Sequence, residues 1–146
     1  MVGVDTNLLV YAHRQESPWH AAAAELLREL AAAPAAWAIP WQCIHEFLSV
    51  ATNPRLFHTP SPMTIARRQV EAWMESPRLR LLGETPGYWP ELERILEQGR
   101  VVGGMVYDAR IAAICLQNGV SELWSADRDF SRMAGLRVRN PLLGRS

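Results

Sequence analysis

Residues 2–12 read VGVDTNLLVYA, two apolar runs separated by Asp5, Thr6 and Asn7. The short first run predicts a buried strand over Val2–Val4, and the second predicts a helix over residues 7–12. Asp5 therefore stands at the point where a strand ends and a helix begins. We start from this junction because the same pattern of strand and helix recurs along the chain.

Four further strands are predicted, the first three of them each preceded by helical periodicity. The strands are expected at Trp37–Ile39, Leu79–Leu82, Glu122–Ser125 and Leu136–Val138. The helices are expected from Ser17-Pro18 to Pro34 and at Trp41–Ala51, Thr64–Glu75, Pro90–Gln98 and Met105–Asn118. This alternation predicts an α/β fold, with a central parallel sheet between two layers of helices. Parallel sheets form their sites at the carboxyl ends of strands, where Asp5 and Asp127 both lie.

The composition excludes several classes of protein. The chain has 146 residues, a length typical of one domain spanning residues 1–146. Its 15 basic residues are all arginine, so Schiff-base chemistry and a phosphate-loop lysine are excluded. The missing lysine also argues against a receiver domain and a haloacid-type phosphatase. Cys43 and Cys115 are expected to be buried thiols, and most of the six tryptophans are expected in the core.

No stretch is apolar for the roughly 18 residues that a membrane helix needs. The first residues also lack the basic segment that begins a signal peptide. We therefore expect a cytoplasmic protein with no membrane contact.

The four aspartates are placed unlike the other acidic residues. They stand at strand ends or within an apolar helix, namely Asp5, Asp108, Asp127 and Asp129. Each alone has an ordinary alternative as a helix cap or turn residue. Asp108 is harder to explain, because aspartate is disfavoured inside apolar helices. Glu46 is expected to point away from the apolar stripe of its helix. Gathered carboxylates repel one another unless a cation neutralises them, and oxygen ligands favour Mg²⁺ or Mn²⁺.

The motifs around these acids resemble those of PIN-domain nucleases, and among them VapC-type toxins of toxin–antitoxin pairs. The family motifs correspond to residues 4–12, 107–112 and 123–130, with Glu46 on the helix where the family places its glutamate. Residues 51–55 and 135–141 fit the VapC subgroup. Tyr107 departs from relatives that often carry histidine, a change expected to affect packing more than metal binding.

The resemblance implies a single PIN domain that cleaves RNA phosphodiester bonds with water activated by Mg²⁺, or Mn²⁺. The implied catalytic metal ligands are Asp5, Glu46, Asp108 and Asp127, with Asp129 as an auxiliary ligand. Asn7 and Ser125 are candidates for orienting the carboxylates, although ordinary turn and cap chemistry explains them equally well. Arg128 and Arg132 are candidates for contacting RNA phosphates, against the alternative of solvated surface arginines.

The resemblance also implies three partners: an RNA substrate, a small cognate antitoxin whose C-terminal segment lies in the active-site groove, and a second copy of the chain in a homodimer. Two alternatives stay open, a PIN nuclease of RNA processing and a catalytically silent PIN interaction module. The 15 acidic residues balance the 15 arginines. If five acids are metal ligands, 15 − 10 leaves a charge of +5 for binding RNA.

Overall fold

The computed structural model describes residues 1–144 of the chain. The strands in this part are β1 (Val2–Val4), β2 (Trp37–Pro40), β3 (Leu79–Leu82), β4 (Glu122–Trp124) and β5 (Val138–Arg139). The α-helices are α1 (Thr6–His13), α2 (His20–Ala32), α3 (Trp41–Ala51), α4 (Met63–Met74), α5 (Tyr88–Gln98) and α6 (Met105–Gln117). A short 3-10 helix, η1 (Arg128–Arg132), follows β4.

The strands form one parallel sheet in the order β3-β2-β1-β4-β5. The central strand β1 pairs with β2 on one side and with β4 on the other, where Val4 lies opposite Trp124. The chain first adds strands on one side of β1 and later returns to add strands on the other. This reversal creates a switch point between β1 and β4, the position where open α/β sheets form their sites.

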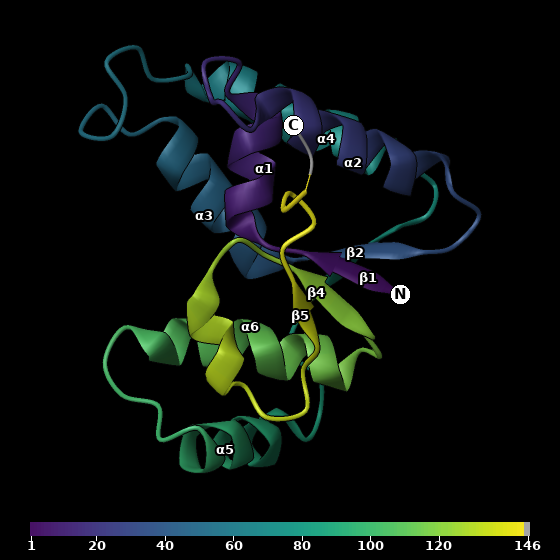
Figure 1. The fold of residues 1–146 in the computed structure, drawn as a ribbon, viewed down its shortest axis with the longest axis vertical. Coiled ribbons are helices and arrows are strands. Elements are labelled where there is room, and N and C mark those ends of the chain that lie inside the picture. The colour runs from purple at the N-terminus through teal and green to yellow at the C-terminus, as the bar shows by residue number, and fades with distance from the viewer. Residues whose placement is uncertain (145–146) are drawn as a thin grey trace.

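The helices lie on two faces of the sheet because the chain travels across it in two directions. Parallel strands are joined by right-handed crossovers, so a reversal of direction moves the connecting helices to the opposite face. In Figure 1, α1, α2 and α4 lie on one side of the sheet and α5 and α6 on the other. The predicted three-layer α/β/α arrangement with a parallel sheet is confirmed.

Several element boundaries differ by one to three residues from the sequence-based expectation, and hydrogen bonds explain two of them. Helix α2 begins at His20 rather than at the Ser17-Pro18 pair, because Ser17 instead forms a turn in which its Oγ accepts from the Trp19 backbone N–H. Strand β5 covers Val138–Arg139 rather than Leu136–Val138, because the Leu136 backbone N–H closes a turn onto Met133 O.

The core contains fewer tryptophans than expected. Trp37 is buried, and Trp73 and Trp124 pack against the core. The expectation is wrong for three tryptophans that lie at or beside helix starts, where the first turn projects beyond the core; these are Trp19, Trp41 and Trp89. Both cysteines are buried free thiols, as predicted, and burial raises the pKa of Cys115 to about 12. Within residues 1–144, no helix has the length and apolar character needed to cross a membrane.

Helix α5 ends against η1 at a glycine. A Cβ atom on Gly99 would lie 2.5 Å from the carbonyl oxygen of Arg132 and 3.0 Å from that of Ile95. Both atoms belong to the backbone, so neither can move aside cheaply. The absence of a side chain at Gly99 thus lets η1 pack closely on α5.

We predict that Gly99→Ala lowers the free energy of unfolding by about 1–3 kcal/mol, the usual cost of overpacking. Gly104→Ala is the matched control, since a Cβ there meets nothing within 4 Å and its φ of −61° suits any residue. The control is expected to change stability by less than about 1 kcal/mol. Urea unfolding of both variants measures the difference, and equal stabilities would contradict the close packing of η1.

Candidate metal and active site

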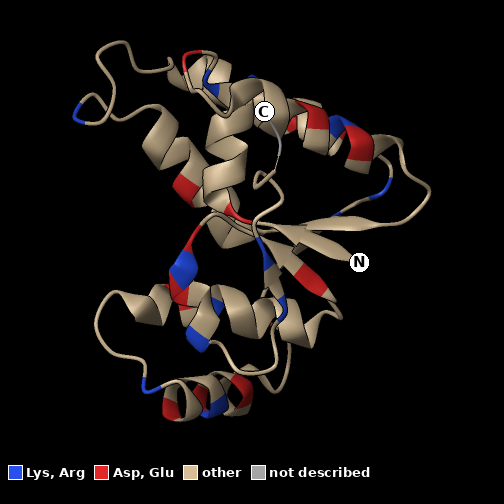
Figure 2. Cartoon of the chain, viewed as in Figure 1, with Lys and Arg blue, Asp and Glu red and all other residues tan. Residues whose placement is uncertain are grey.

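The predicted acids converge at the carboxyl ends of β1 and β4. A cavity of about 270 Å³ is lined by carboxylates from four separate elements: Asp5, Glu46, Asp108 and Asp127. Figure 2 shows acidic segments of α3, of the β1–α1 junction and of α6 with η1 on one side of the molecule, beside the strand ends. The topology brings these acids together because β1 and β4 are neighbours and α3 and α6 flank them on opposite faces.

Asp129 completes the cluster. Carboxylate oxygens of Asp108, Asp127 and Asp129 all lie within 4.8 Å of one another. Burial first, and then the negative charges of the neighbouring acids with Asp127 the largest, together raise the pKa of Asp108 to about 6. In the structure described here, none of the ion pairs over residues 1–144 involves an acid of this cluster. The cluster therefore concentrates negative charge that the protein itself does not neutralise.

Asp5 is the most buried acid of the site, with 5% of its surface exposed. Burial raises its pKa, while hydrogen bonds from Ser125, Thr6 and Cys43 act in the opposite direction. Its Oδ1 accepts from the Thr6 backbone N–H at 2.8 Å, so Asp5 also caps helix α1. Asp5 is thus both a site carboxylate and part of the helix start.

Ser125 links the two central strands beneath the acids. Its Oγ donates to Asp5 Oδ2 at 2.7 Å and accepts from the Asp127 backbone N–H at 3.0 Å and from Asn7 Nδ2 at 3.2 Å. One hydroxyl supplies one donor and two acceptor lone pairs, so these three contacts use its full capacity. Asn7 Oδ1 also accepts from the Ala126 backbone N–H at 3.1 Å. Both residues singled out in the sequence thus lie where they can orient Asp5 and Asp127.

Two contacts to the acids were not foreseen from the sequence. Thr6 Oγ1 donates to Glu46 Oε2 at 2.8 Å, which ties α3 to the start of α1. Cys43 Sγ donates to Asp5 Oδ1 at 3.5 Å, and burial keeps the pKa of that thiol well above its usual range. The available signals were the hydroxyl directly after Asp5 and the spacing of three between Cys43 and Glu46 on one helix. Neither pattern is specific enough to identify a site.

The donor set fits a divalent cation. Every predicted ligand is a carboxylate, and hard cations such as Mg²⁺ and Mn²⁺ prefer oxygen. A cation would also remove the mutual repulsion that raises the pKa of Asp108. The residues placed to hold it are those that line the cavity together with Asp129: Asp5, Glu46, Asp108, Asp127 and Asp129.

The predicted RNA-contact residues and Tyr107 lie around the acids. Arg128 and Arg132 are exposed at the two ends of η1, the short helix that Asp127 caps and that carries Asp129. Tyr107 lies in the first turn of α6 directly before Asp108 with 65% of the residue exposed, and its expected effect on packing near the site stays a prediction.

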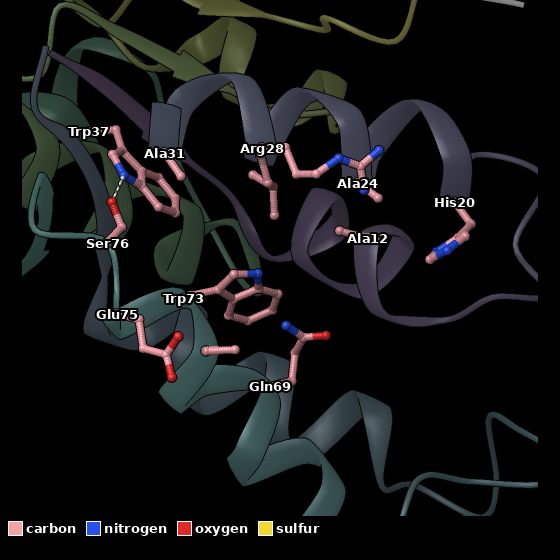
Figure 3. Close-up of a pocket in the computed structure, with 12 residues that line it drawn as sticks. Ala12, His20, Ala24, Arg28, Ala31, Trp37, Gln69, Trp73, Glu75 and Ser76 are labelled. Atoms are coloured by element: carbon pink, nitrogen blue, oxygen red, sulfur yellow. Dashed lines mark hydrogen bonds between the residues drawn. The ribbon is translucent and has the colours of Figure 1, made fainter. Parts of the chain in front are cut away.

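A larger cavity of about 520 Å³ lies elsewhere, between α1, α2 and α4 (Figure 3). Its walls include Trp37, whose indole N–H donates to Ser76 Oγ at 3.0 Å, and Trp73, which points into the space. Glu75 is its one carboxylate, and no residue of the acidic cluster lines it. The chemistry therefore belongs to the smaller acidic cavity.

Comparison with known proteins agrees with this architecture. The model of the PIN domain matches residues 2–136. Ribonuclease VapC48 of Mycobacterium tuberculosis is 32% identical over 140 residues, which cover 96% of this chain and 97% of that protein. Ribonuclease VapC43 of the same species is 34% identical over 146 residues, or 100% of this chain and 99% of that protein.

Solved structures share the fold. The crystal structure of Mycobacterium tuberculosis VapC20, described as a sarcin–ricin loop cleaving toxin, superposes with a TM-score of 0.66 at 18% identity. The match covers 93% of this chain and 96% of that one. VapBC2 from Rickettsia felis, solved with a DNA fragment from its promoter, gives a TM-score of 0.63 at 20% identity over 95% and 98% of the two chains.

We predict opposite effects of Asp108→Asn with and without Mg²⁺. In metal-free protein the change removes a repelled charge, so the melting temperature at pH 7 should rise. Mg²⁺ should stabilise the wild type by about 2.7 kcal/mol at 100 times its Kd and stabilise the variant less. Glu93→Gln, an exposed acid on α5, is the control and should respond like the wild type. Calorimetry measures the melting temperatures of the three proteins. A wild-type melting temperature that Mg²⁺ does not change would contradict the proposed metal site.

The sign of the pH dependence follows from Asp108. Its pKa is 3.8 for an ordinary carboxyl and about 6 in the fold, so the folded state binds the proton more tightly than the unfolded state. The metal-free wild type should therefore lose stability as the pH rises from about 4 to about 6, relative to Asp108→Asn. Calorimetric melting across this range measures the difference, which Mg²⁺ should reduce.

Proposed function

The chain belongs to the PIN-domain family, and we propose that it is a Mg²⁺-dependent endoribonuclease, the toxin of a VapC-type toxin–antitoxin pair. The observation that carries this proposal is the convergence of carboxylates from four elements into one cavity at the β1–β4 switch point. Full-length similarity to proteins named ribonuclease VapC supports the activity and its substrate class.

Hydrogen bonds from the chain's own residues would hold the carboxylates in place. Ser125 and Asn7 hold Asp5 and the Asp127 backbone in place, and Thr6 holds Glu46. A divalent cation bound to the carboxylates would lower the pKa of a water molecule and would stabilise the negative charge that develops on the phosphate. Mn²⁺ satisfies the same oxygen ligands and is the alternative ion.

Arginines beside the acids are placed to contact the RNA backbone. Arg128 and Arg132 are exposed on η1, and a guanidinium can donate two parallel hydrogen bonds to a phosphate. Neutralisation of the acids by the cation would leave this edge of the molecule basic. We therefore assign these two arginines to binding phosphates of the RNA backbone.

The proposed partners are a cognate antitoxin and a second copy of the chain in a homodimer. The antitoxin is supported by similarity to VapC proteins and by the fold shared with VapBC2, which was solved as a toxin–antitoxin complex. The homodimer follows from the family alone. We place this system in the cytoplasm, where RNA substrates are present.

Purified wild type should cleave single-stranded RNA with Mg²⁺ and stop when EDTA removes the cation. Asp108→Asn should reduce the cleavage rate by at least about 100-fold, because it removes a ligand charge from the cluster. Glu93→Gln should cleave like the wild type and so controls for purification and charge. Gel analysis of labelled RNA measures the rates. Cleavage at the wild-type rate in EDTA, or by Asp108→Asn, would rule out the proposed chemistry.

Expression of the chain in a bacterial host should arrest growth, and co-expression of the small gene next to it should restore growth. Asp108→Asn should not arrest growth, since the arrest depends on RNA cleavage. Colony counts after induction measure both effects. RNA cleavage in vitro without growth arrest would instead favour a PIN nuclease of RNA processing, and the absence of both would favour an interaction module.

A further inference from the structure

A second cavity of about 350 Å³ adjoins the acidic one on the side where α3 faces α6. Its lining residues come from these two helices: Gln42, His45, Glu46, Tyr107 and Arg110. Glu46 lines both cavities, and Tyr107 directly precedes Asp108 in the chain. Anything bound here would lie next to the carboxylates, where the proposed function places the phosphate of the RNA.

The α6 wall presents an aromatic ring to solvent. Tyr107 lies in the first turn of α6 and is 65% exposed, so its ring makes little contribution to the core. The exposed ring lines the cavity next to the carboxylates and is therefore available to a ligand there. A flat ring with a polar hydroxyl is well suited to cover the face of a planar ligand.

The α3 wall adds the ring of His45, which lies beside the indole of Trp41. His45 lies one helical turn after Trp41, and their ring centroids are 6.2 Å apart with an angle of 31° between the planes. Both residues are exposed. The histidine ring is thus supported from one side by the indole while it lines the cavity.

Arg110 is fixed in the cavity by two partners. Its Nε lies 3.5 Å from Glu84 Oε1. With its amide oxygen turned toward the guanidinium, Gln42 accepts from Arg110 Nη2 at 2.9 Å and from Nε at 3.2 Å. The guanidinium carries five N–H donors in one plane, more than these contacts use. Arg110 therefore brings a positioned positive charge and free donor capacity to the aromatic cavity.

We propose that this cavity binds the base of the nucleotide next to the cleaved phosphate, and this rests on the proposed ribonuclease function. The base stacks on Tyr107, and Arg110 and Gln42 contact its polar edge or its sugar. Single-stranded RNA supplies such a base, because its bases can turn outward and stack on aromatic side chains. Base binding there would hold the adjoining phosphate against the carboxylates.

The test measures binding separately from cleavage. Asp108→Asn serves as the background, so that a labelled ten-nucleotide RNA stays intact during fluorescence anisotropy with Mg²⁺. Adding Tyr107→Ala should raise the Kd about tenfold, since loss of a stacking ring costs about that much. Adding Tyr107→Phe should keep the Kd within about twofold, because the ring remains. Trp89→Ala, an exposed aromatic residue on α5, is the matched control and should leave the Kd unchanged.

An abasic ribose-phosphate chain of equal length and charge isolates the contribution of the base. The background protein should bind this chain more weakly than RNA, and Tyr107→Ala should cause no further loss. A Tyr107→Ala Kd equal to that of the background, or an equal loss on both ligands, would overturn the proposal. So would a background protein that binds RNA no better than the abasic chain, or not at all. The wild type could cleave no RNA while Tyr107→Ala still weakened binding of RNA but not of the abasic chain. That result would contradict the ribonuclease function and support base binding in this cavity.

Discussion

Repulsion among five carboxylates is the constraint around which the carboxyl edge of this sheet is organised. The switch in strand order brings Asp5 and Asp127 together, and helices from opposite faces add Glu46 and Asp108. Hydrogen-bond donors gather on the buried member, Asp5, which could not otherwise be tolerated at that depth. The more exposed acids have no ion-pair partner among residues 1–144 and are the ones for which a cation is proposed. Hydrogen bonds from the protein thus stabilise the buried carboxylate, and the proposed cation would neutralise the more exposed ones.

The fold and the positions of the acids could largely be predicted from the sequence. Short apolar runs ending in Asp5 and before Asp127 located two strand ends, and parallel strands must end at the same edge. The contacts of Thr6 and Cys43 could not be predicted, because they depend on how α3 packs against α1. The exposure of Tyr107 was also missed, since periodicity gives the face of a helix but not what covers it.

The neutral composition hides an uneven distribution of charge. The formal charge is zero because 15 arginines balance 15 acids, four of which line one cavity while a fifth, Asp129, lies beside them. A count over the whole chain treats these five as ordinary surface charge, although they repel one another and form the proposed cation site. For a nuclease of this kind, the location of the acids therefore carries more information about the substrate than their number.

Asp5 is both the cap of helix α1 and a carboxylate of the site, whereas Asp108 has no such structural duty. The two positions should therefore diverge differently during evolution. A descendant that abandons the chemistry can lose Asp108 and gain stability by doing so. At position 5 it must retain a side chain that caps a helix, and Asn or Ser are the replacements that do. Silent relatives should thus keep a polar residue at position 5 long after the acidic cluster has gone.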